Sequence, residues 1–197
     1  CDVIHQLHLL RASPEHPATD DERMAHHREL SGIEMAPTTR APSTGCPAAC
    51  SSTPPQFLEK LGDLYMEKGI KPELEIFDAG MLGVASYFVK KGHLSTPCHY
   101  QFCLGVLGGM PATVENLLYL VQHIPAGSTW SAFGVGKGHL PILFASLALG
   151  GHIRVGMEDN VMYAKGVRPR ATCSSWSAPA ASSRSTASRS PPPPRPA

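Results

Sequence analysis

Between positions 57 and 167, the spacing of hydrophobic residues alternates between a helical and a strand-like pattern. Stretches with apolar residues three and four positions apart predict helices, and short runs rich in β-branched and aromatic residues predict strands. The predicted helices are 57–69, 81–91, 113–123 and 140–149, and the predicted strands are 72–78, 99–105, 129–134 and 152–156. This regular order indicates an α/β fold in which crossover helices connect the strands of a parallel sheet.

Glycine or acidic residues follow directly after each predicted strand. Polar, glycine-rich segments at the carboxyl ends of the strands are typical of the active-site face of a (β/α)8 barrel. A doubly wound sheet gives the same alternation, so the pattern leaves both architectures open. The turns at 105–109 and 134–138 lack the spacing of phosphate-binding loops, which favours tight turns between strand and helix over an anion site.

The two ends of the chain differ in texture from this core. Residues 1–55 show no regular period except at 19–35, where Asp20 and Asp21 indicate the start of a short helix. Residues 171–197 contain 8 Ser and 6 Pro and no Leu, Ile or Val, so this tail has little to bury and is expected to be disordered. We therefore divide the chain into an irregular segment 1–55, a core 56–168 and a Ser/Pro-rich tail 169–197.

Composition and charge narrow the class of protein. The 197 residues carry 17 Lys and Arg against 16 Asp and Glu, a net charge of +1, which argues against nucleic acid or an anionic membrane as a partner. The longest apolar run, 140–149, is shorter than the about 18 residues of a membrane-spanning helix. The six cysteines include an isolated Cys46–Cys50 pair with no second pair to complete a zinc site, and the set indicates reduced thiols of a cytoplasmic protein.

A basic and two acidic residues stand together at the end of the last predicted strand. Arg154 lies between Ile153 and Val155, and a buried cation there requires a carboxylate such as Glu158 or Asp159. One interpretation is a metal-binding carboxylate beside an acid/base group at the mouth of a barrel. The other is a surface strand that ends in a solvated turn, and the residues alone leave both open.

Four segments of the core together resemble the β-keto acid cleavage enzymes, whose type member cleaves 3-keto-5-aminohexanoate in lysine fermentation. The segments are KPELEIFDAGML (71–82), YQFCLGVLGGMPATVENLLYLV (100–121), PAGSTWSAFGVGKGHLP (125–141) and GGHIRVGMEDN (150–160). The resemblance runs continuously over about residues 57–167. It implies a (β/α)8 TIM barrel, of which this chain would form a part, about strands 3–8, without the N-terminal strands. Residues 1–55 would then be an irregular remnant of strands 3–4.

The resemblance also implies a reaction and a site. Family members convert a β-keto acid and acetyl-CoA into acetoacetate and a new acyl-CoA, with a catalytic Zn²⁺ that polarises the keto carbonyl. Glu158 matches the family's metal-binding glutamate, Asp159 its essential aspartate and Arg154 the arginine that orients the acidic groups. A carboxylate base would help to form an acetyl-CoA enolate. The expected partners are a small β-keto acid and acetyl-CoA, with no nucleic acid or membrane, and the intact family member is expected to be a homo-oligomer.

The sequence departs from the family pattern in its first part. The His-x-His that supplies two of the zinc ligands is absent, and catalytic zinc takes about three protein ligands, so we expect this chain alone to be inactive. We hypothesise that residues 5–18, 38–55 and 169–197 are frame-shifted translations of ordinary family sequence, which the coding DNA would test. The alternatives are another metal-dependent TIM-barrel lyase or aldolase, and a non-enzymatic interaction protein that uses the Ser/Pro tail with its PPPPRP motif.

Overall fold

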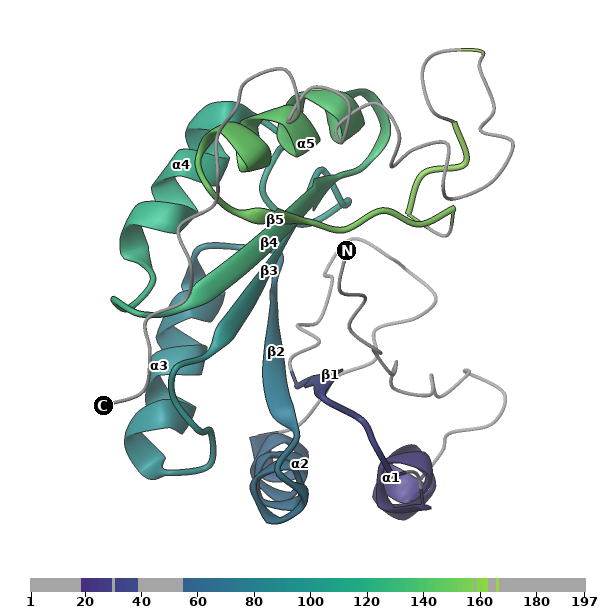
Figure 1. Cartoon of the computed structure of the whole chain (residues 1–197), viewed down its shortest axis with the longest axis vertical. Helices are drawn as coiled ribbons and strands as arrows, with labels where there is room; N and C mark the ends of the chain where they lie inside the picture. Colours follow the sequence, from purple (N-terminus) through teal and green to yellow (C-terminus); the bar gives the residue numbers. More distant parts are fainter. Residues whose placement is uncertain (1–18, 30, 39–54, 158, 163–165, 167–197) are drawn as a thin grey trace.

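A computed structural model of the chain describes residues 19–29, 31–38, 55–157, 159–162 and 166 (Figure 1). These residues form a parallel five-stranded sheet whose strands stand in chain order, β1-β2-β3-β4-β5. The strands are β1 (Met35–Pro37), β2 (Lys71–Ile76), β3 (His99–Leu104), β4 (Thr129–Gly134) and β5 (His152–Ile153). The helices are α1 (Asp20–Glu29), α2 (Pro55–Lys68), α3 (Gly80–Lys91), α4 (Val114–His123) and α5 (His139–Ala148), with a 3-10 turn η1 (Gly136–Gly138) before α5.

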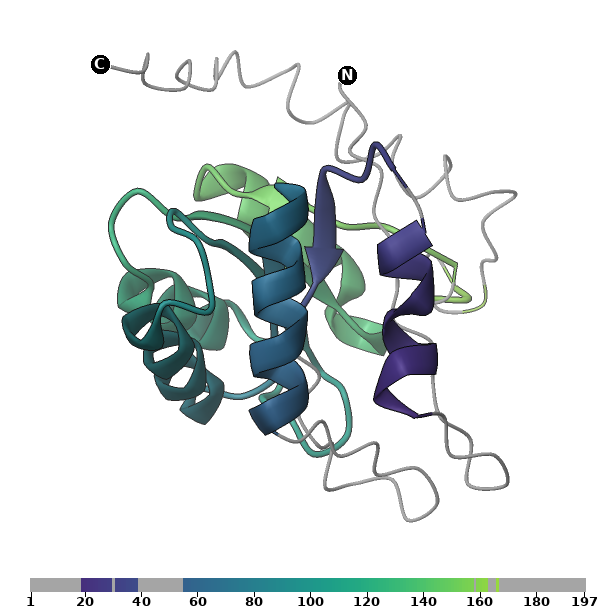
Figure 2. The ribbon, with the colours of Figure 1, turned by 90° about the horizontal axis from the view of Figure 1, so that it is seen from below.

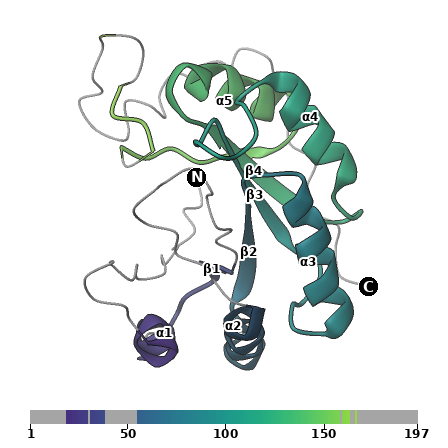
Figure 3. The ribbon, with the colours of Figure 1, turned by 180° about the vertical axis from the view of Figure 1, so that it is seen from behind.

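The strand order decides between the two architectures that the sequence left open. A doubly wound sheet reverses its strand order at a switch point, and the described strands contain no such reversal. Helices α3, α4 and α5 lie together on one side of strands β2–β4 (Figures 1 and 3). Strands in sequence order with helices on one side are the arrangement of a (β/α) barrel wall, so the partial barrel that the sequence predicted is confirmed.

The two faces of the sheet have opposite chemistry. Leu74, Ile76, Tyr100, Phe102 and Leu104 face the helices and pack in one buried cluster. Helices α3, α4 and α5 complete this cluster with Ala85, Phe88, Leu117, Leu120 and Ile142. The alternate positions of the same strands carry buried polar side chains, among them Glu73, Glu75, His99, Gln101 and Ser131. Since side chains of a strand alternate between its faces, these polar residues share the second face of the sheet.

A second, smaller cluster joins the first helices to β1. Met24 of α1 packs with Phe57, Leu61 and Tyr65 of α2 and with Ala36 of β1. Figures 1 and 2 show α1 and α2 side by side. This cluster holds the amino-terminal strand and helix of the described structure against the rest of the sheet.

Helix α1 confirms its expected start and corrects its expected end. Helix α1 begins at Asp20 as expected, but Thr19 and Glu22 make the reciprocal cap, with the Thr19 N–H donating to Glu22 at 2.8 Å and the Glu22 N–H to Thr19 at 3.3 Å. The helix ends at Glu29, and Met35, which we expected in the same element, belongs to β1 and pairs with Lys71. Pairing with β2, a contact distant in sequence, overrides local helical preference here.

The other predicted elements are found within a few residues of their expected limits, except for the last strand. The prediction of 152–156 was wrong in length, because the ladder with β4 ends after Ile153. The Cys46–Cys50 pair, the irregular stretches and the Ser/Pro tail lie outside the described residues. None of the helices in the described part of the chain combines the length and the apolar composition that a membrane span requires.

Candidate functional site

The polar face of the sheet is arranged in rows across the strands. The register pairs Glu75 with Gln101, Gln101 with Ser131 and Ser131 with His152, so these four residues form one row. Because each row gathers side chains from successive strands, this face brings together polar groups that lie far apart in the sequence.

Arg154 is the centre of the charged part of this face. Its Nε and one terminal nitrogen donate to the two carboxylate oxygens of Asp159, at 3.0 and 3.2 Å. The other terminal nitrogen donates to Glu75 at 3.1 Å. The guanidinium also lies 4.8 Å from the centre of the Phe133 ring. Such a forked pair fixes the orientation of the carboxylate as well as its charge.

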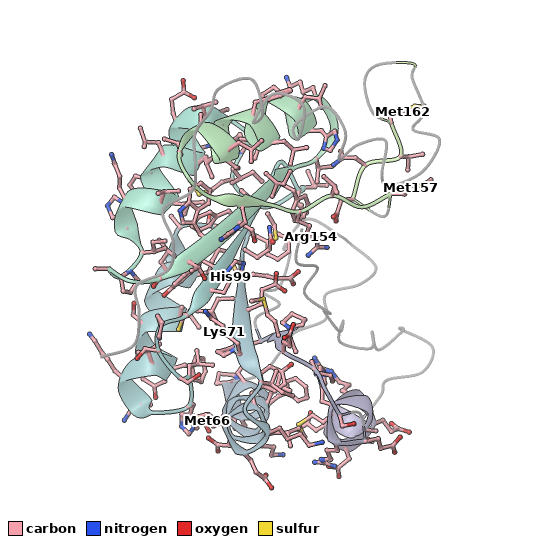
Figure 4. All side chains as sticks on the ribbon, viewed as in Figure 1. Met66, Lys71, His99, Arg154, Met157 and Met162 are labelled. Carbon is pink, nitrogen blue, oxygen red and sulfur yellow. The ribbon has the colours of Figure 1, made fainter. Side chains whose placement is uncertain are left out.

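The contact with Glu75 requires a strongly curved sheet. Glu75 is on β2 and Arg154 follows β5, and three strand spacings separate these strands, about 14 Å on a flat sheet. Side chains of a flat sheet stand nearly parallel and would not meet across this distance, yet the two groups are 3.1 Å apart. The polar face is therefore concave, and Arg154 lies away from helices α3 and α4 (Figure 4).

Burial and neighbouring charges set the protonation of this cluster. Burial by itself lowers the pKa of Arg154, but the negative charges of Asp159 and Glu75 outweigh it and raise that pKa. Burial, together with the charge of Glu75, raises the pKa of Glu73 to about 7 against the opposing effect of Arg154. Burial also raises the pKa of Cys103 well above its ordinary value, so this thiol stays protonated. The cluster thus holds one permanent cation among several carboxyl groups.

His99 belongs to a separate hydrogen-bond chain deeper on the same face. Its Nδ1 lies 2.9 Å from the Thr129 hydroxyl and its Nε2 2.9 Å from the Ser131 hydroxyl. Ser131 donates its only hydrogen to the Gln101 carbonyl, so it accepts from His99 Nε2–H, and Nδ1 accepts from Thr129. Burial and the neighbouring His152 and Lys71 lower the pKa of His99 to about 4. His99 is therefore a neutral member of a fixed network and not a free base.

The structure brings together two of the three site residues that the sequence indicated. Arg154 and Asp159 form the forked pair, while Glu158 lies outside the described residues. Sequence reasoning missed Glu75. The signal was present, since Glu73 and Glu75 alternate with apolar residues in the strand predicted at 72–78.

The described residues do not fit the implied zinc ion. Within the part of the chain that the structure describes, no three His, Cys, Asp or Glu side chains lie together in a group that could hold a metal ion. Both oxygens of Asp159 accept from Arg154. We therefore derive no chemical step through a metal from these side chains.

A family model and several relatives match the chain. The model, described as beta-keto acid cleavage enzyme, matches residues 1–174. The chain belongs to the β-keto acid cleavage enzyme family. Over 110 residues it is 40% identical to the 3-keto-5-aminohexanoate cleavage enzyme of Fusobacterium nucleatum, covering 56% of this chain and 40% of that protein. The enzyme of the same name from Acetoanaerobium sticklandii is 44% identical over 104 residues, 52% of this chain and 38% of that protein.

A third relative and a solved structure extend this result. The 3-oxoadipate:acetyl-CoA acetyltransferase of Cupriavidus necator is 33% identical over 141 residues, 68% of this chain and 50% of that protein. The chain thus spans half or less of the length of these curated relatives. The apo structure of ObcA matches with a TM-score of 0.66 and 18% identity, covering 87% of this chain and 46% of that one. At this identity the likeness concerns the fold.

Proposed function

We propose that this chain supplies the Arg154–Asp159 part of an active site that exchanges acyl groups between a β-keto acid and acetyl-CoA. The observation that carries the proposal is the forked pair on the concave face, beyond the end of β5. In parallel βα barrels the carboxyl ends of the strands form the active-site face. Relatives named for 3-keto-5-aminohexanoate cleavage and for 3-oxoadipate and acetyl-CoA support the substrate class.

The overall reaction determines which carbon atom must lose a proton. A β-keto acid and acetyl-CoA give acetoacetate and a new acyl-CoA, so the acetyl group ends on the methylene carbon between the keto and carboxyl groups. That carbon must lose a proton before it bonds to the acetyl carbon, with CoA thiolate leaving. The thiolate then adds to the original keto carbonyl, the old carbon–carbon bond breaks, and the methylene carbon regains a proton. The enolate therefore forms on the keto acid and not, as the family resemblance had led us to expect, on acetyl-CoA, since an acetyl-CoA enolate would yield acetate instead of acetoacetate.

Asp159 is the proposed base for this proton and Arg154 its positioning partner. The two guanidinium hydrogen bonds fix the orientation of the Asp159 carboxylate. The positive charge of Arg154 also favours an enolate forming beside it. Glu75 holds the third side of the guanidinium, so that Arg154 cannot rotate away from Asp159.

A chimaera tests the proposal. Residues 55–162 replace the matching segment of the Acetoanaerobium sticklandii enzyme, to which the chain is 44% identical over 104 residues. We expect acetoacetate to form from 3-keto-5-aminohexanoate only when acetyl-CoA is present. Asp159→Asn should lower kcat at least about 100-fold, the usual effect of losing an acid/base group.

Asp63→Asn is the matched control, because Asp63 pairs with His93 at 2.9 Å, at a side-chain exposure of 57%, apart from the concave face. It should leave kcat within about twofold. A folded chimaera that forms no acetoacetate, or one in which Asp159→Asn keeps full activity, would contradict the proposal.

We further propose that Glu158 is a zinc ligand and that the chain alone lacks activity. A catalytic zinc takes about three protein ligands, and Glu158 is the single ligand that the family pattern assigns here. The purified chain, dialysed against micromolar zinc, should retain well under one equivalent and form no acetoacetate. One equivalent of tightly bound zinc, or acetyl-CoA-dependent turnover by the chain, would refute this part.

A further inference from the structure

Asn160, directly after the proposed base, links two loops through its side chain. Its carbonyl oxygen accepts from the Gly136 N–H at 2.9 Å, and its amide nitrogen donates to the Gly134 carbonyl at 2.9 Å. The same nitrogen lies 3.1 Å from Nδ1 of His139. The residue as a whole is only 8% exposed. The three partners lie at the end of β4, in the turn η1 and at the start of α5, more than 20 residues before Asn160 in the chain.

The chemistry of these partners fixes the orientation of the Asn160 amide. A backbone N–H can only donate and a carbonyl can only accept, so the oxygen must face Gly136 and the nitrogen Gly134. His139 Nδ1 is then an acceptor, and its buried Nε2 carries the hydrogen. Burial lowers the pKa of His139, which agrees with this neutral form. No other arrangement satisfies all three contacts, so Asn160 specifies one position of the segment that carries it.

The backbone alone holds this segment weakly. Strand β5 has two residues, and beyond it the Arg154 N–H reaches the Ala132 carbonyl only at 3.5 Å. The Asp159 and Asn160 N–H groups both donate to the Gly156 carbonyl, at 3.2 and 3.1 Å, so the two residues share one tight turn. A turn fixed at Asn160 has little freedom to move the adjacent Asp159.

We propose that Asn160 is a positioning residue, which anchors the turn after β5 to the β4–α5 loop and so holds Asp159 in its forked pair with Arg154. This inference rests on the function proposed for that pair. The inference goes beyond the proposed function, because it makes the geometry of the Arg154–Asp159 pair depend on a residue that touches neither the guanidinium nor the reacting atoms.

The test follows the Arg154 Nε–H, which donates to Asp159 at 3.0 Å, by ¹⁵N-resolved NMR of the full chain. Its signal is assigned by its loss in Arg154→Lys. In Asn160→Ala, exchange of this hydrogen with water should become at least about tenfold faster, because the turn no longer holds the carboxylate against it. Asn160→Asp keeps the acceptor for Gly136 and loses both donations, so its exchange rate should lie between those of the wild type and Asn160→Ala.

Asn116→Ala is the matched control. Asn116 also donates from its side chain to a loop carbonyl, that of Pro111 at 2.9 Å, but on α4. It should reduce the melting temperature and leave the Arg154 signal unchanged. If both Asn160 variants lower stability while the Arg154 exchange rate stays that of the wild type, Asn160 is only a structural residue and the inference fails. Because this measurement needs no turnover, an inactive chimaera would overturn the proposed function without affecting its result.

Discussion

Replacing Arg154 with Met tests whether the charged cluster is as buried and coupled as its geometry indicates. The side chains of Arg154, Glu75 and Asp159 are 15%, 10% and 11% exposed. Removing one member of a buried ion pair costs about 3–5 kcal/mol, because the remaining charges stay in a poorly solvated place. We expect the lower end, about 3 kcal/mol, since some solvent still reaches the guanidinium. Methionine keeps most of the volume, so that little of the loss comes from a cavity.

Two further variants make this expectation specific. Arg28→Met removes the exposed pair between Arg28 and Asp21, whose side chains are 47% and 80% exposed, and should cost less than about 1 kcal/mol. Combining Arg154→Met with Glu75→Gln removes one of the carboxylates that faced the lost cation. The double variant should therefore be destabilised by less than the sum of the two single variants.

Urea unfolding at pH 7 measures these differences. The fluorescence of Trp130, which is buried on β4, reports on the sheet, and circular dichroism checks that both probes unfold together. A loss for Arg154→Met as small as that for Arg28→Met would refute the coupled cluster. Strict additivity of Arg154→Met and Glu75→Gln would show that the 3.1 Å contact contributes nothing.

Three other expectations concern pH and packing. Folding raises the pKa of Glu73 from 4.5 to about 7, so the wild type should lose stability relative to Glu73→Gln as the pH rises through this window. Urea unfolding at pH 5 and pH 8 measures the difference in unfolding free energy between the two proteins. The same difference at both pH values would contradict the burial of Glu73. Folding lowers the pKa of His99 from 6.5 to about 4, so relative to His99→Gln the wild type should lose stability as pH falls through that range, and a flat difference in acid titrations would speak against its neutral network. A Cβ on Gly138 would lie 2.2 Å from that of Ala112, whereas one on Gly83 meets nothing within 4 Å. Thermal melts should therefore show Gly138→Ala destabilised by about 1–3 kcal/mol and Gly83→Ala stabilised by about 0.5–1 kcal/mol, and equal effects would exclude the close packing.

Local signals in the sequence predicted most of the elements correctly. The Thr113 start of α4 was found where expected, with its hydroxyl accepting from the Asn116 N–H. Helix α3 ends at Lys91, its predicted limit, and Gly92 caps it in a left-handed conformation. Caps and apolar periods act within a few residues, and a single sequence therefore contains enough information to place them.

Errors arose where distant pairing decides the local structure. The local pattern groups Met35 with the preceding helix, whereas its pairing with Lys71 makes it a strand residue. The last strand is shorter than its apolar pattern, since the ladder with β4 ends at Ile153. Strand pairing depends on which segments meet in space, and hydrophobic periods carry no such information.

The sequence by itself determined the alternation of helix and strand and the family resemblance, and it indicated Arg154 and Asp159 as candidate site residues, because each of these rests on the order and spacing of neighbouring residues. Only the tertiary structure decided that the strands follow one another without reversal and that the sheet curves enough for Glu75 to reach Arg154 from three strands away. Curvature is a property of the whole sheet and of the helices that pack on its outer face. The sequence therefore showed Glu75, the third carboxylate contact of the guanidinium, only as an acidic residue that alternates with apolar ones.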